Sequence, residues 1–395
     1  MQNFELYTPT KVIFGKDTEN KAVKQIVAFG GTKVLIHYGS NSVVKSGLLD
    51  RVCRTLEVAS LPYVLLGGVV PNPRLSKVLE GVELCKQEGV DFILAVGGGS
   101  VIDSAKAIGF GVFDKGDVWD YFDRVREIPG CIPVGCILTI AGAGSEMSNS
   151  CVITNENGWI KRGCSKSDFA RPCFAILNPE LTYTLPSYQT ASGIVDILMH
   201  TMERYFSNET MEITARLSES LLKTVMNNAY VVMHNPKNYP ARAEIMWAGS
   251  LSHNGLLGCG TEGGDWAPHQ FGHELSGMFD VAHGASISAI WSSWARYVYQ
   301  SNLPRFVSFA TNVMDIPIEG TLNQVALAGI EAMENFFAKI GMPYNIPQLG
   351  ITVTQEQIEE MAEKCSFFRS RTIGTIQILD REDMVAIYSM AKVER

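Results

Sequence analysis

Histidines and an aspartate are concentrated in two short parts of this chain. Four of its seven histidines lie in two segments, DILMH at 196–200 and HQFGHELSGMFDVAH at 269–283. Asp196 and His200 are four residues apart in a helical pattern, and His269 and His273 repeat that offset. Side chains four residues apart leave the same face of a helix. Carboxylate and imidazole groups in this arrangement favour a divalent-metal site.

With His283, the two helical pairs give five potential ligands, which is more than one ion needs. A catalytic metal takes three or four protein ligands and keeps a position open for substrate. One of the five groups is therefore expected to orient a ligand or to relay a proton, and the spacing does not identify it. The other histidines stand apart in the sequence and are interpreted as ordinary core or surface residues: His37, His234 and His253.

The composition predicts a folded, two-domain protein that binds a small molecule. The chain has 395 residues, of which 46% are hydrophobic and 19% are charged. Its formal charge of −8 gives no basic surface for nucleic acid or an anionic membrane. The sequence has no 18-residue apolar run and no secretory signal pattern, and its nine cysteines form no CxxC pair. We therefore expect a cytoplasmic protein without disulfides.

The elements that must position these groups fall into two kinds. From about residue 33, β-rich and amphipathic runs alternate: KVLIHYG, SVVKSGLLDRVCRTLEV, YVLLGGV, PRLSKVLEGVELCKQEG and DFILAVGGG. This βαβαβ pattern predicts a parallel sheet with helices on both faces and ligands at the carboxyl ends of the strands. Further β-rich runs follow in CIPVGCILTI, SCVITN and CFAILNP.

After about Pro186 the pattern becomes helical, as in YQTASGIVDILMHTMERYFS and TLNQVALAGIEAMENFFAKIG. We predict an α/β dinucleotide-binding domain over residues 1–185 and an all-α metal-binding domain over residues 186–395. The segment TLPSYQT at the boundary predicts a tight hinge, with a ligand cleft beside it.

A glycine-rich turn joins one predicted strand to the next helix in DFILAVGGGSVIDSAKAIGF. Glycine permits a close backbone approach, and the helix beginning near Ser100 presents free N–H groups to an anion. The three glycines at 97–99 and Ser100 therefore predict a pyrophosphate site, although a strand–GGGS–helix segment can also be a plain tight turn.

The end of the first βαβ strand predicts the type of nucleotide. An NAD site usually has an acidic residue there for the ribose hydroxyls, whereas this chain has Gly39. Polar groups that follow could donate to a 2′-phosphate: Ser40, Asn41, Ser42 and Lys45. NADP(H) is therefore favoured, with NAD(H) as the alternative. A solvated polar turn is the other interpretation of this segment.

Together these features resemble the iron-containing (group III) alcohol dehydrogenase family, within it the butanol dehydrogenase and NADPH-dependent aldehyde reductase branch. The likeness spans nearly the whole chain and is carried by PTKVIFG, GVVPNP, AVGGGSVIDSAKAI, LTIAGAGSEMSNSCVIT, LNPELTYTLP, ASGIVDILMHTMERYF, DWAPHQFGHELSG and VAHGASI. It implies the dehydroquinate synthase-like fold, with a Rossmann-like domain, a helical domain, an active site between them, and bound Fe²⁺ or Zn²⁺.

The resemblance also implies residue roles. The family's metal ligands fall on Asp196, His200, His269 and His283, and its non-ligand histidine, a proton-relay candidate, falls on His273. Its cofactor contacts fall on Gly98, Gly99, Ser100, Asp103 near the nicotinamide, and Thr139. Lys161, or the adjacent Arg162, matches a lysine near the phosphates. Two departures are Ala143, where threonine is usual, and YGSNS in place of YGGGS.

The function implied is interconversion of primary alcohols and aldehydes by NADP(H), with metal polarisation of the carbonyl. His273, or the cofactor ribose hydroxyl working with it, would supply the proton, and Asp103 is the second candidate catalytic residue. Trp266 and Phe271 are either apolar pocket walls or core aromatics. A homodimer is expected. One alternative is a dehydroquinate synthase-like cyclase or lyase, which needs several Lys and Arg, yet residues 250–283 contain none. The other alternative is a non-catalytic structural protein.

Overall fold

The computed structural model describes residues 1–39, 41–164 and 167–393. The chain divides into two compact units, one of Tyr7–Leu185 and one of Pro186–Arg395 with Met1–Leu6. The first six residues, which the predicted domain of residues 1–185 includes, are thus grouped with the second unit. That each unit is a domain with its own ligand stays a prediction.

The Tyr7–Leu185 unit contains a six-stranded parallel sheet with the order β1-β8-β5-β4-β2-β3. Its strands are β1 (Lys11–Phe14), β2 (Val34–Gly39), β3 (Tyr63–Val69), β4 (Phe92–Gly97), β5 (Val134–Leu138) and β8 (Phe174–Leu177). The order β3-β2-β4-β5-β8 is that of flavodoxin-like doubly wound sheets, in which ligands bind where the strand order reverses. The predicted Rossmann-like parallel sheet is confirmed, and its reversal point lies between β2 and β4.

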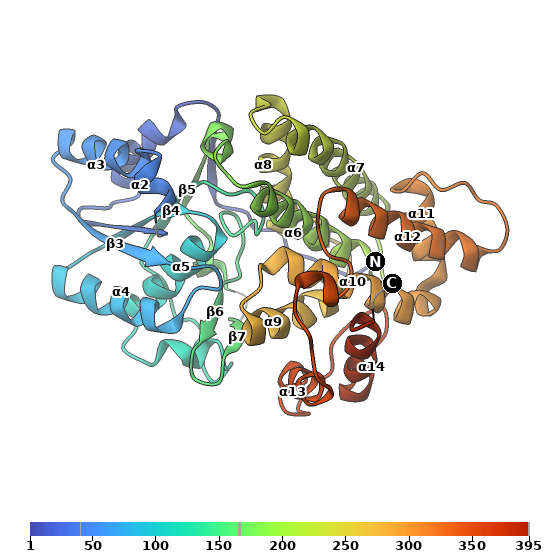
Figure 1. Cartoon of the computed structure of the whole chain (residues 1–395). Helices are drawn as coiled ribbons and strands as arrows, with labels where there is room; N and C mark the ends of the chain where they lie inside the picture. Colours follow the sequence, from blue (N-terminus) through green and yellow to red (C-terminus); the bar gives the residue numbers. More distant parts are fainter. Residues whose placement is uncertain (40, 165–166, 394–395) are drawn as a thin grey trace. The chain divides into compact units, whose positions relative to one another are not determined.

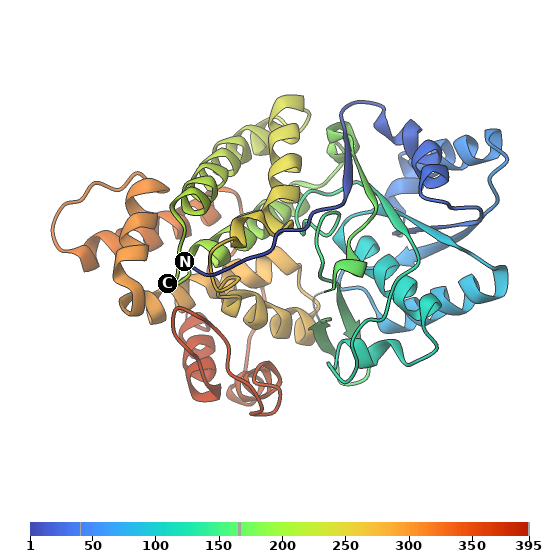
Figure 2. The same ribbon diagram turned by 180° about the vertical axis from the view of Figure 1, so that it is seen from behind.

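Helices cover both faces of this sheet (Figures 1 and 2). They are α1 (Ala22–Ala28), α2 (Ser42–Lys45), α3 (Leu48–Val58), α4 (Leu75–Glu88) and α5 (Gly99–Phe113). Alternate strand residues such as Ile36, Leu94 and Ile176 pack with α1 and α3 in one core cluster. On the other face, His37 of β2 contacts Ser104 of α5. Because both faces are covered, the central strand FILAVG is apolar and buried throughout.

The segment SCVITN forms a strand outside this sheet. It contains β6 (Val152–Asn155), which pairs antiparallel with β7 (Ile160–Gly163) in a separate hairpin. The sheet is instead extended at its edge by β1, which pairs with β8 from more than 150 residues away in the sequence. Short 3₁₀ helices also occur in this unit: Thr18–Lys21, Val118–Tyr121, Asp168–Ala170 and Pro179–Thr182.

The described part of the second unit is helical, apart from one isolated bridge between Ile373 and Leu379. Its helices are α6 (Ser187–Tyr205), α7 (Glu212–His234), α8 (Tyr239–His253), α9 (Ala267–Phe279), α10 (His283–Val298), α11 (Leu303–Asn312), α12 (Leu322–Lys339), α13 (Gln355–Cys365) and α14 (Arg381–Ala391), with 3₁₀ turns at Leu256–Gly258, Tyr299–Asn302 and Pro347–Leu349. This confirms the predicted all-α second half.

Helix α10 is central to this unit and packs against α6, α9, α12 and α14 (Figure 1). Its Trp291 and Trp294 are fully buried among the rings of Phe206, Phe306 and Phe309. Among the described residues, no helix is both long and apolar enough to cross a membrane. The core around α10 thus packs against α6 and α9, the other helices that carry the predicted ligands.

Candidate functional site

Helix α6 carries a stripe of three buried polar residues on one face. Asp196, His200 and Glu203 follow one another at intervals of four and three residues, and all are buried. Because 3.6 residues make one helical turn, these side chains leave the helix on the same side. The sequence prediction included the first two residues and missed Glu203, although the same periodicity includes it.

Helices α9 and α10 supply the remaining histidines. His269 and His273 lie on α9, and His283 is the first residue of α10. The next residue, Gly284, lies so close to α6 that a Cβ there would be 2.0 Å from the backbone oxygen of Ser192. A residue without a side chain at position 284 therefore allows His283 to approach the stripe on α6.

The donor atoms of these residues converge. Asp196 Oδ1 lies 3.7 Å from His200 Nδ1, 3.5 Å from His269 Nε2 and 3.7 Å from His283 Nε2. Ligand atoms bound to one tetrahedral ion at about 2.1 Å are about 3.4 Å apart. These three distances from Asp196 suit a single divalent ion, and the ligand atoms of Asp196, His200 and His269 all lie within 4.8 Å of one another.

The same atoms lack other partners. Asp196 Oδ1, His200 Nδ1 and His269 Nε2 are buried, and none has a hydrogen-bond partner among the described residues. Leaving a buried polar atom unsatisfied costs about 1–3 kcal/mol, so three such atoms around one point need a common partner. A metal ion supplies that partner, so the residues present fit the ion that the sequence predicts.

The charges of the cluster are consistent with this fit. Burial lowers the pKa of His200 well below its ordinary value, and its neighbouring histidines lower it further. Burial also disfavours the charged form of His269, but Glu203 and Asp196 outweigh that effect and raise its pKa to about 9. A metal ion bound here would therefore displace a proton from His269.

His273 is placed differently from the four predicted ligands. Its ring stacks on that of His283, with centroids 5.5 Å apart, and its centroid lies 6.3 Å from that of His269. It is buried next to the donor cluster. His273 therefore lies next to the predicted ligands, and its role beside the metal stays a prediction.

Two carboxylates that the sequence analysis missed hold the beginning of α9. Glu203 accepts hydrogen bonds from the backbone N–H and the Nδ1 of His269, at 2.8 and 2.6 Å. Asp265 accepts from the backbone N–H of Ala267 and, with its other oxygen, from Thr375 and Ile376. The helix that carries two of the histidines thus begins against two buried anions.

His253, interpreted from the sequence as an ordinary core or surface residue, lies beside the cluster. Its ring centroid lies 4.0 Å from that of His200, nearly perpendicular to it, and 5.7 Å from that of Trp266. Sequence spacing concealed this because α8, which ends at His253, packs against α6. Of the remaining pair, His37 is fully buried and His234 is exposed, as expected for core and surface residues.

The two aromatic residues near the ligands differ in their surroundings. Phe271 is fully buried against the ring of Tyr388, which identifies it as a core aromatic. Trp266 is partly exposed, lies beside His200 and His269, and packs under the guanidinium of Arg204 at 4.5 Å. Only Trp266 therefore keeps the interpretation as a wall of a substrate pocket.

In the first unit, the predicted nucleotide contacts lie at the carboxyl ends of neighbouring strands. Gly39 ends β2, Gly97 ends β4, and Thr139 follows β5 directly. Asn41 and Ser42 form the beginning of α2, whereas Ser40 lies outside the described residues. The sheet thus brings together the segments that the sequence assigned to the nucleotide.

Packing leaves little room for side chains at the glycines of the turn, least of all at Gly99. A Cβ at Gly98 would lie 3.1 Å from Ile140, and one at Gly99 would lie 2.6 Å from Ala143. Helix α5 begins at Gly99 without a side-chain cap. Uncapped N–H groups in the first turn, next to a backbone without side chains, are suited to binding a pyrophosphate.

Asp103 and Lys161 are occupied within their own unit. The Asp103 carboxylate accepts hydrogen bonds from the Ser145 hydroxyl and the Val152 N–H, and burial raises its pKa. Lys161 Nζ is buried and donates to Asn72 Oδ1 at 2.8 Å. Arg162 forms an ion pair with Asp123. The predicted cofactor contacts of Asp103 and Lys161 therefore compete with existing bonds, and both remain predictions.

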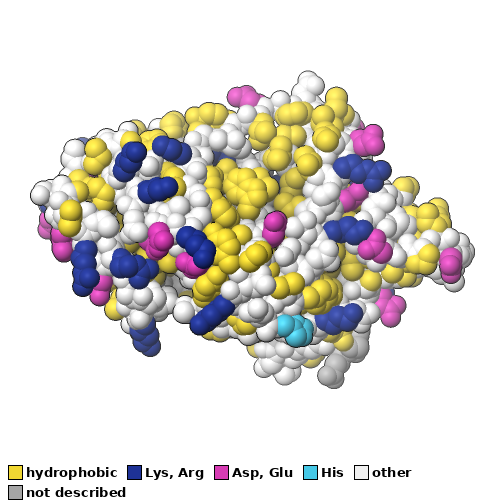
Figure 3. All heavy atoms as spheres, turned by 90° about the horizontal axis from the view of Figure 1, so that it is seen from above, with side chains coloured by type: hydrophobic (Ala, Val, Ile, Leu, Met, Phe, Trp, Pro, Cys, Tyr) yellow, Lys and Arg dark blue, Asp and Glu magenta, His cyan; other side chains and the backbone are white. Residues whose placement is uncertain are grey.

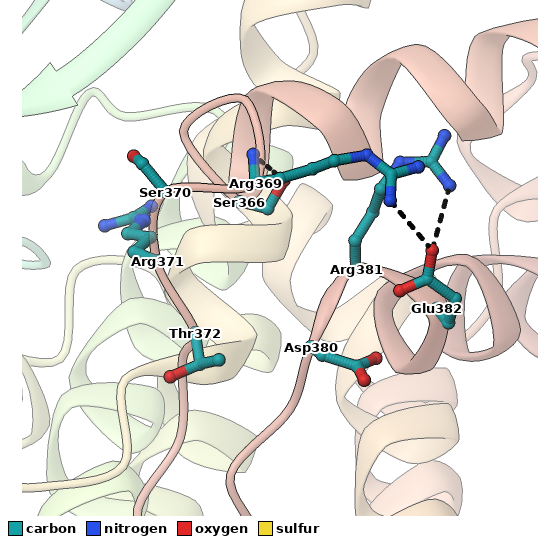
Figure 4. Close-up of a pocket in the computed structure, with 8 residues that line it drawn as sticks. All are labelled: Ser366, Arg369, Ser370, Arg371, Thr372, Asp380, Arg381 and Glu382. Atoms are coloured by element: carbon teal, nitrogen blue, oxygen red, sulfur yellow. Dashed lines mark hydrogen bonds and ion pairs between the residues drawn. The ribbon is translucent and has the colours of Figure 1, made fainter.

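A surface depression of about 560 Å³ lies between the end of α13 and the beginning of α14 (Figure 4). Three arginines line it, but Arg381 pairs with Glu359 and Glu363, and Arg369 pairs with Glu363 and Glu382. Arg371 donates to Gln270 and to the backbone oxygen of Cys365. No histidine lines this depression, and its arginines are bonded to neighbouring residues, so it does not resemble a metal site.

Comparisons with known proteins identify the family of the chain. The family model of iron-containing alcohol dehydrogenase matches residues 9–179, and that of the C-terminal part of the family matches residues 190–392. The chain is 35% identical over 390 residues to NADH-dependent butanol dehydrogenase A of Clostridium acetobutylicum, covering 98% of this chain and 99% of that protein. It is 35% identical over 355 residues to the NADPH-dependent aldehyde reductase YqhD of Escherichia coli, covering 89% and 90%.

A solved structure gives the same result. NADH-dependent butanol dehydrogenase A of Thermotoga maritima superposes with a TM-score of 0.95 and 37% sequence identity, over 99% of both chains. The Escherichia coli YqhD structure superposes with a TM-score of 0.93 and 32% identity, also over 99% of both chains. The similarity thus spans both units, and the chain belongs to the iron-containing alcohol dehydrogenase family.

Proposed function

We propose that this protein is a metal-dependent, NADP(H)-linked oxidoreductase that interconverts small primary alcohols and aldehydes. The observation that carries the proposal is the set of three buried donor atoms on Asp196, His200 and His269 that have no other partner. Relatives named as butanol dehydrogenases and aldehyde reductases support the substrate class. They also favour a dehydrogenase over the cyclase and structural alternatives.

Asp196, His200, His269 and His283 would hold Fe²⁺ or Zn²⁺. When bound, such an ion supplies Lewis-acid polarisation of a carbonyl oxygen. His273 is buried beside these residues, and its imidazole can carry and donate a proton. We assign to it the transfer of that proton to the oxygen of the reduced aldehyde.

The nucleotide would bind at the carboxyl end of the sheet. Backbone N–H groups of Gly98, Gly99 and Ser100 would bind its pyrophosphate, and Thr139 would lie beside it. NADP(H) is supported by Gly39, where no carboxylate repels a 2′-phosphate. The names of the relatives include both NADH and NADPH, so the nucleotide must be measured.

We also propose a cytoplasmic homodimer. All nine cysteines are free thiols, which suits a reducing compartment. Large hydrophobic side chains are exposed on α7 and α8, namely Ile213, Leu217, Tyr230, Val231 and Trp247. Figure 3 shows hydrophobic side chains gathered on the face that carries these helices. A second copy would cover them, and sedimentation of the purified protein measures this directly.

The test of the proposed activity is one steady-state assay. NADPH and NADH oxidation would be followed with a panel of C2 to C6 aldehydes, with metal analysis of the same sample. We expect aldehyde-dependent oxidation, faster with NADPH, and about one divalent ion per chain. Absence of both metal and turnover after gentle purification would favour the structural alternative.

A further inference from the structure

We propose that Glu203 is a positioning residue of the metal centre, which fixes both the orientation of the His269 ring and the nitrogen that His269 presents to the ion. This inference rests on the proposed metal-dependent function and goes beyond its ligand set. Glu203 provides no ligand atom itself. Its effect on the ion is exerted through His269.

The contacts of Glu203 are directed at a single residue. One carboxylate oxygen accepts the backbone N–H of His269 at 2.8 Å, and the other accepts its Nδ1–H at 2.6 Å. Glu203 is fully buried, so water does not compete for either oxygen. Because one carboxylate accepts both the backbone N–H and the ring Nδ1–H of His269, it fixes the position of the backbone and the orientation of the ring together.

The bond to Nδ1 determines the chemistry of the opposite nitrogen. When Nδ1 carries the proton and donates it to Glu203, Nε2 is left with a lone pair. Nε2 is the nitrogen that lies 3.5 Å from Asp196 Oδ1 and has no hydrogen-bond partner among the described residues. The hydrogen bond from Nδ1–H to the Glu203 carboxylate also makes Nε2 a better electron donor to a metal ion.

The bond to the backbone determines where the ligand lies. His269 is the third residue of α9, the second is Pro268, which has no N–H, and the residue before the helix is Trp266 with φ of 63° and no side-chain cap. The N–H of His269 is thus a first-turn donor that needs an outside acceptor. Glu203 supplies it from α6, the helix that also carries Asp196 and His200, so one residue sets the ligands of both helices in register.

The test is the Zn²⁺ affinity of metal-stripped protein, measured by competition with a chromophoric chelator. In Glu203→Gln the side chain keeps its shape but has one acceptor oxygen and an amide NH₂, which faces one of the two donors of His269. We expect Zn²⁺ to bind about 10- to 100-fold more weakly. The visible spectrum of Co²⁺ bound in its place should also change, because the ligand field depends on His269.

Glu219→Gln is the matched control. Glu219 is a buried carboxylate of the same unit that accepts hydrogen bonds from Tyr205 and Asn312. Its variant should lose stability while its Zn²⁺ affinity and Co²⁺ spectrum stay at the wild-type values. If Glu203→Gln does not fold, Glu203→Asp, which keeps the charge on a shorter arm, should still show weakened Zn²⁺ binding.

The inference is overturned if Glu203→Gln, or Glu203→Asp in its place, binds Zn²⁺ as tightly as wild type. It is also overturned if Glu219→Gln loses as much affinity, since the effect would then be general destabilisation. These results differ from a failure of the proposed function, which would appear as wild-type protein that binds neither Zn²⁺ nor Fe²⁺.

Discussion

Both units contain buried histidines, and the two environments differ in one respect. In the sheet unit, His37 is fully buried, and both ring nitrogens are bonded, Nδ1 to the Leu66 backbone oxygen and Nε2 to the Ser104 hydroxyl. In the helical unit, His200 and His269 are also buried, yet each has one nitrogen without a hydrogen-bond partner among the described residues. Burial alone therefore does not identify a ligand. A ligand is identified by a ring nitrogen that has no hydrogen-bond partner and lies close to other metal-binding atoms that also have none.

The largest effect should come from removing a donor. His269→Ala should lose bound metal and activity together, because the remaining donors hold the ion too weakly and the buried Glu203 keeps only the backbone N–H of residue 269 and loses the ring Nδ1–H. The measurement is metal content after gel filtration, alongside turnover. His283→Ala should also lose metal, but without the added instability. Retention of a full equivalent of metal by either variant would contradict the ligand assignment.

The next effect separates a ligand from its neighbour. His273→Ala should keep its metal while turnover falls by about 10²- to 10⁴-fold, the range typical of general acid–base groups. The measurement is kcat together with metal analysis on the same preparation. Metal loss equal to that of His269→Ala would move His273 into the ligand set and erase the distinction drawn from its position.

His37, whose two ring nitrogens are both hydrogen-bonded, should make the stability of the protein depend on pH. Burial lowers the pKa of His37 to about 4, from an ordinary value of 6.5. The unfolded chain therefore binds this proton more readily, so the stabilising contribution is complete above pH 6.5 and is lost as the pH falls towards 4. Between these values, the free energy of unfolding of wild type should fall by up to about 3 kcal/mol more than that of His37→Gln.

Urea unfolding of the two proteins at several pH values measures this difference. Ser104→Ala, which keeps the imidazole and removes one of its hydrogen-bond partners, serves as the control and should retain most of the pH dependence. Parallel pH profiles for wild type and His37→Gln would show that His37 is not the titrating group.

The smallest effect is expected at Gly39, where the predicted nucleotide site has no side chain. A Cβ at Gly39 would lie 3.6 Å from the Val69 oxygen and 3.9 Å from Val101, which are ordinary contacts, so Gly39→Asp should fold. The new carboxylate should repel the 2′-phosphate of NADP(H) and accept hydrogen bonds from the ribose hydroxyls of NAD(H). We expect the kcat/KM ratio to move towards NADH by about tenfold, or 1.4 kcal/mol.

Val58→Asp places the same charge on an exposed residue at the end of α3 and should leave the ratio unchanged. A wild-type enzyme that already prefers NADH, or an unchanged ratio in Gly39→Asp, would argue against a 2′-phosphate next to Gly39.

Local patterns predicted the elements well. The run KVLIHYG became β2, DFILAVGGG became β4 followed by α5, and YQTASGIVDILMHTMERYFS became α6. Each of these depends on hydrophobic periodicity and on glycine at a turn, which are properties of neighbouring residues. The pairing of β1 with β8 and the separate β6–β7 hairpin were not predicted, because partners distant in the sequence leave no local signal.

The same limit applies to the site. The i, i+4 spacing of Asp196 and His200 indicated ligands because both groups lie on one helix. His253 gave no such signal, since its neighbour His200 is on another helix. Glu203 could have been found as the next residue of the stripe on α6, but nothing in the sequence indicates that its partner is His269, 66 residues away.

Gly284 has a consequence for how this metal centre tolerates sequence change. A Cβ at this position would overlap the Ser192 backbone oxygen, so any other residue must push the beginning of α10 away from α6. His283, the adjacent residue, would move with it, while Asp196 and His200 would stay on α6. Substitution at position 284 should therefore disturb the metal centre as substitution of a ligand does, although glycine has no side chain and donates nothing to the ion.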